Sequence, residues 1–520
     1  MRVEEAIKAS MSCKSWLSAW TTGPNLEFVF VKHCGFLEVA EFFGSKPLPQ
    51  KRRHEIYREG IKYQQLLEHI NTTLRRYHPE KLPIQSFKIH PYRFEDGRTP
   101  DFLEEWVQIA LQKGAKTLDL GSYSAQLPLP ELVLVSKNLV ELLLHNFVLF
   151  KLDIQHCHQL KRLHLHHVKF ADQLAFGNLM SSCESIESLE FRNCELNLYE
   201  QDIFHRQQQL KRLALQFSEV DEFTFGNLMS CFKSVEDLVI WRGAGMEDFV
   251  IPELPCLQKL SLYGCRLTLL HPCPNLNHLR LVSVNVTNTF FQDLDNNCPN
   301  LKYLYLYVTG DCSLDSMMTI KISSSSLEIL RLNTYHEEIL VHAPNMIRFE
   351  FTTSSVRGVP NLYITGSSNQ WTSRIEVRSP KVLDHSFYKL KNLVSNISQS
   401  KISFLKFRTL SEKVIFDINE VMDDMPFSPP YIEHLSLRGR WDENRLTCLL
   451  DGIFWCCRPK TLSLSWSYVQ GSDPFVDVVM NIQRQNHNQN GRKLWANDLK
   501  QVKVEATRYD DRTYVLEWGK

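Results

Sequence analysis

The clearest pattern along the chain is a short apolar phrase: a leucine, two residues of any type, a second leucine, one residue of any type and a third leucine. Leu301, Leu304 and Leu306 form one copy. Further copies, some with another apolar residue in place of leucine, are Leu139/Leu142/Leu144, Leu160/Leu163/Leu165, Ile186/Leu189/Phe191, Leu210/Leu213/Leu215, Val235/Leu238/Ile240, Leu257/Leu260/Leu262, Leu276/Leu279/Leu281, Leu327/Leu330/Leu332 and Met346/Phe349/Phe351. Because strand side chains alternate, the phrase predicts strands with inward leucines and outward intervening residues.

The copies follow one another at steps of about 19 to 26 residues, within the range of leucine-rich repeats. The segment Phe176 to Ser181 recurs unchanged as Phe225 to Ser230, which is independent evidence for a repeat. No single copy can bury its apolar edge alone, whereas a stack of copies can. We therefore predict an α/β fold: a leucine-rich-repeat solenoid with a curved parallel β-sheet and helices or loops on the convex side.

Breaks in this rhythm divide the chain. We expect an N-terminal segment at 1–34, a connecting region and N-terminal cap at 35–115, regular repeats at 116–355, degenerate repeats at 356–480 and a C-terminal cap at 481–520.

Two segments outside the regular phrases also carry clear patterns. Phe102 to Leu111 has helical spacing, and Gly114 is a suitable stop. Leu499 to Glu505 and Tyr514 to Trp518 predict a terminal hairpin or a pair of edge strands, which would cover the apolar side of the last repeat.

The first 34 residues carry a different motif. Ala6 to Trp20 has helical spacing, Thr21 to Pro24 ends the helix, and Leu26 to Phe30 alternates like a strand. Lys14-Ser15-Trp16-Leu17-Ser18-Ala19-Trp20 followed by Pro24-Asn25-Leu26-Glu27-Phe28 resembles the second half of a plant F-box. The Leu-Pro-x-Glu-Ile-Leu helix that opens this family's motif does not occur in the chain, so we expect a short helical F-box remnant.

The resemblance implies a function. In plant F-box/leucine-rich-repeat proteins the F-box docks on the Skp adaptor of an SCF-type ubiquitin ligase, and the repeats hold the protein to be degraded. By this resemblance Ile7, Met11, Trp16 and Trp20 would contact the Skp adaptor and, through it, a cullin. The chain would be a non-catalytic substrate-recognition subunit, cytoplasmic and/or nuclear. The alternative is a leucine-rich-repeat scaffold or decoy that lacks ligase coupling because the F-box is incomplete.

Composition narrows the possible partners. The 59 basic and 59 acidic side chains cancel, which argues against nucleic acid as a partner. No apolar run is long enough to cross a membrane, and the first residues lack the apolar core of a signal peptide. Several of the 14 cysteines stand at fixed offsets from the phrases, and this placement predicts buried structural thiols. These cysteines are Cys157, Cys183, Cys194, Cys265, Cys273 and Cys298.

The outward positions of the phrases predict the surface that binds a client protein. They carry tyrosine, tryptophan and arginine, the residue types enriched at binding hot spots. The candidate residues are Trp241, Tyr263, Arg280, Tyr303, Tyr305, Tyr307 and Arg331. The alternative is a surface covered by the protein's own loops.

Candidate chemistry is sparse. Histidines cluster at His156, His158, His164, His166 and His167, but no carboxylate or cysteine stands at a matching offset in the sequence, so we expect no metal site there. We find no Gly-rich phosphate loop, no nucleophile elbow and no His-Glu-x-x-His. We therefore expect no enzymatic activity and no cofactor.

Overall fold

The computed structural model of the 520-residue chain forms two compact units, Met1–Met246 and Glu247–Lys520. The structure describes residues 25–29, 68, 70–72, 74–75, 83–90, 101–122, 126–150, 157–171, 173–194, 209–216, 229, 232–241, 249–286, 290–291, 293–307, 319–334, 336, 338–353, 360–365, 371–379, 386–398, 400–409, 429–439, 443–466, 500–506 and 513–517.

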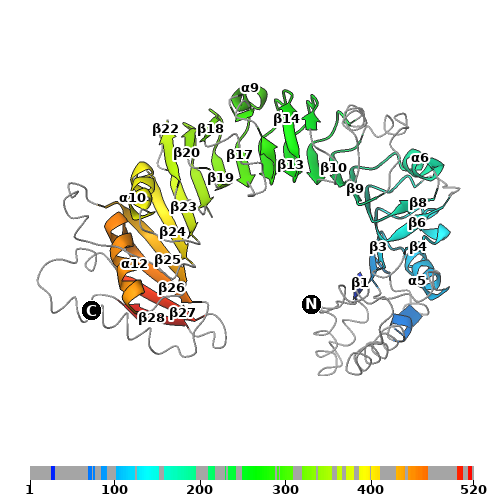
Figure 1. Cartoon of the computed structure of the whole chain (residues 1–520). Helices are drawn as coiled ribbons and strands as arrows, with labels where there is room; N and C mark the ends of the chain where they lie inside the picture. Colours follow the sequence, from blue (N-terminus) through cyan, green and yellow to red (C-terminus); the bar gives the residue numbers. More distant parts are fainter. Residues whose placement is uncertain are drawn as a thin grey trace, which may run out of the picture. The chain divides into compact units, whose positions relative to one another are not determined.

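The N-terminal unit is built on one parallel ladder, in which each strand pairs with the next (Figure 1). Its strands are β1 (Asn25–Val29), β2 (Ser86–His90), β3 (Thr117–Gly121), β5 (Glu141–His145), β7 (Arg162–His166), β9 (Ser188–Arg192), β10 (Arg212–Gln216) and β11 (Asp237–Trp241). The regular array was expected to begin at residue 116. Strands β1 and β2 extend the same ladder further toward the N-terminus.

The C-terminal unit continues the same design. Its ladder runs in parallel through β13 (Lys259–Tyr263), β15 (His278–Val282), β17 (Tyr303–Tyr307), β19 (Ile329–Thr334), β21 (Arg348–Thr353), β23 (Thr372–Ser379), β24 (Lys401–Thr409), β25 (Tyr431–Gly439), β26 (Arg458–Trp466) and β27 (Gln501–Ala506). Strand β28 (Thr513–Glu517) then pairs antiparallel with β27, which confirms the predicted terminal strand pair.

The leucines of the phrase form the core of both units. In the C-terminal unit Leu279, Leu304 and Leu330 lie side by side on β15, β17 and β19, and all three are fully buried. Burying one such side chain contributes roughly 1.5–3 kcal/mol. The predicted strand phrase with inward leucines is therefore confirmed for these repeats.

A tight corner follows many of the five-residue ladder strands. Asn146, His167, Asn193, Gly264 and Ser283 each stand directly after one, and all have positive φ, between 50° and 65°. Four of the five are not glycine, although this backbone region is costly for most other residue types. Their N–H groups continue the ladder: that of Asn146 donates to the carbonyl of His166, and that of Ser283 to the carbonyl of Tyr307.

Short strands that follow several of the ladder strands form secondary sheets. These consist of β4 (Leu127–Pro128), β6 (Phe147–Leu149) and β8 (Lys169–Phe170) in the N-terminal unit, and in the C-terminal unit of β12 (Phe249–Ile251), β14 (Arg266–Leu270) and β16 (Asn285–Val286), and of β18 (Thr319–Ser323), β20 (Glu338–His342) and β22 (Asn361–Thr365). Side-chain amides also link successive repeats: Asn275, Asn300 and Asn345 each donate to a backbone carbonyl of the preceding repeat at 2.7–2.8 Å.

Helices fill several of the return segments: α5 (Asp101–Gln112), α6 (Gln173–Ser182), α9 (Leu294–Asn297), α10 (Ser386–Asn396) and α12 (Glu443–Cys456) (Figure 1). Helix α5 confirms the predicted helix, and Gly114, just after it, has a positive φ of 86°. Helices α10 and α12 pack closely at Gly452, where an added Cβ would lie 2.5 Å from Cε1 of Phe387. No helix in the described part of the chain combines the length and apolar character needed to cross a membrane.

The prediction of buried structural cysteines is confirmed. Cys157, Cys183, Cys194, Cys265, Cys273 and Cys298 are all free and buried. Burial raises the pKa of Cys194 to about 11 and that of Cys298 to about 12, so both remain protonated thiols at neutral pH.

Candidate functional site

Each ladder strand presents a second set of side chains, which alternate with the buried leucines. We call the surface formed by these outward side chains the ladder face. Two groups on it stand out: aromatic and basic residues in the C-terminal unit, and histidines with two carboxylates in the N-terminal unit.

In the C-terminal unit, Tyr263, Arg280, Tyr303, Tyr305, Tyr307 and Arg331 lie together on four consecutive ladder strands, and we call them the tyrosine–arginine patch.

Arg280 stands at the centre of this patch. Its Cζ atom lies 4.9 Å from the ring centroid of Tyr305 on one side and 5.6 Å from that of Tyr263 on the other. Both distances allow a cation–π attraction. Arg280 is exposed and the two tyrosines are half-buried, so the three side chains hold one another in place while remaining accessible.

The next strand fixes the other side of the patch. The guanidinium of Arg331 lies 5.5 Å from the ring centroid of Tyr303, and its Nε is 2.9 Å from Oε2 of Glu350 on β21. The ring of Tyr303 also stacks on His278 with centroids 4.0 Å apart and an interplanar angle of 7°. Aromatic stacking and ion pairing therefore both order the patch.

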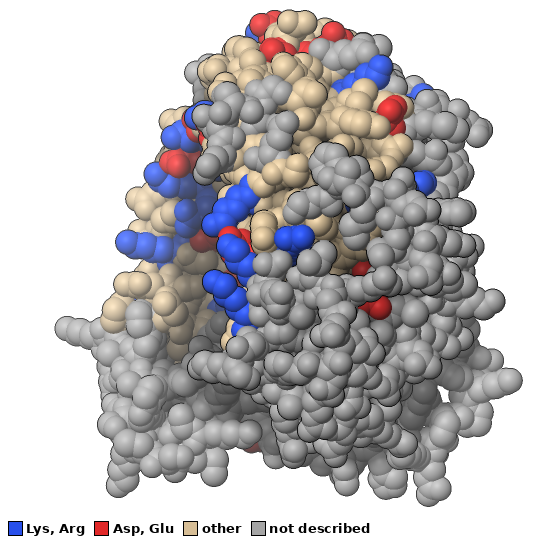
Figure 2. Space-filling view, turned by 90° about the vertical axis from the view of Figure 1, so that its left-hand side faces the viewer, with Lys and Arg blue, Asp and Glu red and all other residues tan. Residues whose placement is uncertain are grey.

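Further positive charge follows on β23 to β25. Arg374 lies over the ring of Phe404 at 4.3 Å, and Arg378, Arg408 and Arg438 occupy one row on three neighbouring strands. The Nε atom of Arg438 is buried without a hydrogen-bond partner among the described residues. Figure 2, which faces the side of the molecule at the left of Figure 1, shows lysine and arginine side chains gathered with few acidic side chains between them.

Trp241, the seventh predicted client-binding residue, belongs to the N-terminal unit. It ends β11, and the guanidinium of Arg192 lies 4.4 Å from its ring centroid. Of the predicted adaptor contacts, Ile7, Met11, Trp16 and Trp20 all lie outside the described residues.

The histidines of β7 have a carboxylate partner that sequence reasoning missed. His164 Nδ1 and His166 Nε2 lie 3.2 Å and 3.0 Å from the two carboxylate oxygens of Glu190 on the neighbouring strand β9, and Arg192 also pairs with Glu190. The sequence shows no carboxylate at a matching offset, because Glu190 reaches these histidines through the pairing of β7 with β9. Burial raises the pKa of Glu190, but the two histidine hydrogen bonds and the charge of Arg192 outweigh it, so its pKa lies below the usual range.

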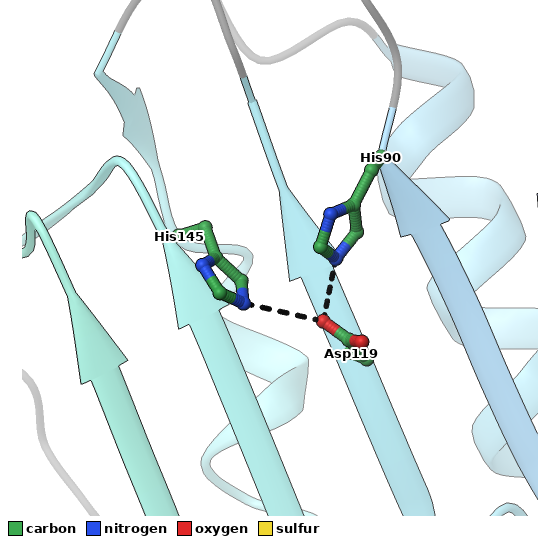
Figure 3. Close-up of side chains that lie close together, drawn as sticks. All are labelled: His90, Asp119 and His145. Atoms are coloured by element: carbon green, nitrogen blue, oxygen red, sulfur yellow. Dashed lines mark hydrogen bonds and ion pairs between the residues drawn. The ribbon is translucent and has the colours of Figure 1, made fainter. Parts of the chain in front are cut away.

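A second cluster, which the sequence did not predict, joins β2, β3 and β5 (Figure 3). His90 Nε2 lies 2.5 Å from Oδ1 of Asp119, and His145 Nε2 approaches the same oxygen at 3.6 Å. Lys88 Nζ lies 3.0 Å from the other oxygen, Oδ2. We call His90, Asp119 and His145 the His–Asp–His cluster. His90 and Asp119 are buried, and His145 keeps 28% of its side-chain surface exposed.

The cluster's protonation follows from these contacts. Burial raises the pKa of Asp119, but the hydrogen bonds and charges of His90 and Lys88 outweigh this effect. The net pKa is below its usual value, so the carboxylate is ionised at neutral pH. Burial, together with the charges of His166 and His90, lowers the pKa of His145 to about 4, so its ring is neutral at neutral pH.

These three residues come from three different repeats, so no local motif contains them. Aligning the strands Ser86–His90, Thr117–Gly121 and Glu141–His145 would have placed them on one face, because these strands pair in simple register.

Comparisons with known proteins agree with the repeat architecture. A family model described as Leucine Rich Repeat matches residues 160–183. Two F-box/LRR-repeat proteins of Arabidopsis thaliana are similar to the chain, one 30% identical over 126 residues and the other 33% identical over 112 residues. These matches cover 24% and 21% of this chain, and they span 29% and 28% of the relatives' own lengths.

Among solved structures, the leucine-rich repeat domain of APL1B aligns over 79% of this chain and 92% of its own, with 13% identity. The TM-score of this alignment is 0.27.

Proposed function

We propose that the chain, which is similar to two F-box/LRR-repeat proteins of Arabidopsis thaliana, is a substrate-recognition subunit of an SCF-type ubiquitin ligase. In this proposal the ladder face of the C-terminal unit binds the client protein through Tyr263, Arg280, Tyr303, Tyr305, Tyr307 and Arg331. Trp241 adds a contact on the N-terminal unit. The N-terminal segment with Ile7, Met11, Trp16 and Trp20 binds the Skp adaptor and, through it, a cullin.

The observation that carries the client-binding proposal is Arg280 held between Tyr263 and Tyr305. A side chain that is ordered before binding loses less conformational freedom when a partner docks, so more of the contact energy remains as affinity. Tyrosine and arginine are also the side chains that most often dominate binding energy at protein interfaces. Burial raises the pKa of Tyr305, so its hydroxyl stays protonated and can donate a hydrogen bond to a client.

Charge indicates what kind of client segment fits. Glu350 and Glu376, two carboxylates of this ladder face, already pair with basic side chains: Glu350 with Arg331 and Arg348, and Glu376 with Arg378 and Lys406. No such carboxylate pairs with Arg280, Arg374, Arg408 or Arg438 among the described residues. This surplus of positive charge favours an acidic client segment, because opposite charge accelerates encounter and excludes basic competitors.

The proposed mechanism is proximity. A client held on the ladder face places its lysines near a conjugating enzyme carried by the same assembly, which raises their effective concentration. The chain itself would contribute binding and no catalytic residue. This role places it in the cytoplasm or the nucleus, where such ligases act.

One experiment tests both halves of the proposal. The chain is expressed in plant cells with a proximity-labelling tag, and the labelled proteins are compared with those of an Arg280→Ala/Tyr305→Ala variant. The matched control is Tyr363→Ala, which removes an exposed tyrosine of β22, outside the ladder. We expect a set of acidic proteins that the wild type and Tyr363→Ala label equally and the double variant labels at least tenfold less.

The same set should become more abundant when the chain is removed from the cells, and the chain should co-purify with the Skp adaptor unless Trp16 and Trp20 are replaced by alanine. Equal labelling by all three forms would refute the client surface. A client set that depends on Arg280 and Tyr305 without adaptor co-purification or any change in abundance would instead identify a scaffold.

A further inference from the structure

We propose that His90, Asp119 and His145 bind a divalent transition-metal ion of the zinc class on the ladder face of the N-terminal unit. Imidazole nitrogens and carboxylate oxygens are ordinary ligands for Zn²⁺, and sites with three protein ligands leave the fourth position open. That position would be filled by water or by a donor group from a bound partner.

The distances within the cluster suit such an ion. Zinc–ligand bonds of about 2.0–2.1 Å in a tetrahedron place neighbouring ligand atoms about 3.3 Å apart. Asp119 Oδ1 lies 2.5 Å from His90 Nε2 and 3.6 Å from His145 Nε2, and one ligand atom from each of the three residues lies within 4.8 Å of the others. Figure 3 shows both ring nitrogens directed at the same carboxylate oxygen. Small side-chain shifts would therefore complete the ligand set.

The surroundings hold the ligands in this arrangement. Lys88 Nζ takes Oδ2 of Asp119, which leaves Oδ1 for the metal; a second partner of this kind orients a metal-binding carboxylate. The lysine charge opposes a nearby cation and so limits the affinity. Gly121 leaves space for the His90 ring, because a Cβ there would lie 2.9 Å from His90 Cγ. Half-buried His145 leaves an approach from solvent.

The neighbouring Glu190 cluster shows what a plain hydrogen-bonded arrangement looks like on the same face. There His164 and His166 contact different carboxylate oxygens, and Arg192 occupies the carboxylate as well. The nitrogens do not converge on one point, so no metal position results. This contrast makes His164 a matched control: it is a ladder-face histidine bound to a carboxylate, but it does not belong to the His–Asp–His cluster.

The test uses the full chain with a histidine-free tag, stripped of metal and titrated with Zn²⁺ alone by calorimetry and with Co²⁺ alone by visible absorption. We expect one equivalent whose affinity falls at least tenfold in both Asp119→Asn and His145→Ala and is unchanged in His164→Ala. The visible absorption bands of tetrahedral Co²⁺ should likewise be lost in Asp119→Asn and His145→Ala and kept in His164→Ala. Because the chain has other histidines and free thiols, the difference between variants is the measured quantity.

Thermal unfolding of each metal-free variant checks that it is folded. Should Asp119→Asn fail this check, the half-exposed position 145 decides alone. Identical titrations of the wild type and His145→Ala, or no Zn²⁺ binding by the wild type, would overturn the proposal. These measurements involve the chain alone, so their outcome is independent of the ubiquitin-ligase assignment.

Discussion

Replacing Leu304 by alanine tests whether neighbouring repeats support one another through the buried leucines. Leu304 is fully buried between Leu279 and Leu330 on the adjacent strands, which are fully buried as well. Removing a leucine from such a site costs about 2–5 kcal/mol, because the surroundings close the cavity only in part. In a repeat protein each repeat contacts only its neighbours, so we expect this loss to be concentrated near β17.

Hydrogen exchange followed by mass spectrometry resolves that loss strand by strand. Since 1.4 kcal/mol corresponds to a factor of ten, exchange in β15, β17 and β19 should accelerate between about 30-fold and several thousand-fold. Strands β24 to β26, several repeats away in the same unit, should change much less. The matched control is Leu269→Ala, the same substitution on β14 at a side chain that is 46% exposed, which should cost less than about 1 kcal/mol.

Two results would refute the reasoning. If Leu304→Ala accelerated exchange equally in all described strands of the C-terminal unit, the unit would unfold as a single cooperative body rather than by neighbouring repeats. If Leu304→Ala and Leu269→Ala behaved alike, the buried leucines would not be the main source of stability.

Three further predictions concern packing, backbone and charge. Gly452→Ala should destabilise the C-terminal unit by about 1–3 kcal/mol in thermal unfolding because the new methyl group meets Phe387, even though alanine normally favours a helix over glycine. Adding Phe387→Leu should restore part of the lost stability. An unchanged or higher Tm in Gly452→Ala would contradict this prediction. Because φ at Ser283 is 54°, Ser283→Gly should be neutral or stabilise the chain by up to about 1 kcal/mol in urea unfolding, whereas Ser283→Val should destabilise it by about 1–2 kcal/mol. Equal effects of the two substitutions would contradict the conclusion that the positive φ at this corner is costly for most residue types. Because the folded pKa of Glu190 is lowered, its contribution to stability should be complete above its unfolded pKa of about 4.3 and should fall as the pH drops below that value. Glu190→Gln should cost about 1–3 kcal/mol at pH 7 and should reduce the fall of the urea unfolding midpoint with decreasing pH. An equally steep fall in the variant would contradict the conclusion that Glu190 has a lowered pKa.

The sequence predicted the ladder well because the pattern that indicates each strand lies within a few consecutive residues of one repeat. Leu301, Leu304 and Leu306 fall in one phrase, and inward burial follows from alternation alone. The same alternation identified the outward residues of the tyrosine–arginine patch, whose six members do lie on adjacent strands. Their role in binding a client stays a prediction.

What the sequence did not reveal depends on contacts between repeats. Glu190 meets His164 and His166 because β7 and β9 pair in register, not through any offset visible in the chain. Residues 356–480 were expected to form degenerate repeats rather than regular leucine phrases. There β23 places Ile375 and Val377 in the buried positions instead, with an irregular register between Ser373 and Arg374 against β24.

The positive-φ corner marks the boundary between the part of a repeat whose length is fixed and the part whose length can vary. Wherever the pattern holds, five strand residues and one corner residue form a unit of constant length, whereas the return path to the next strand varies. Insertions and deletions in the return path therefore leave every ladder-face side chain opposite the same neighbour. Related proteins can thus differ in loop length while each outward-facing residue keeps the same position relative to its neighbours on the adjacent strands.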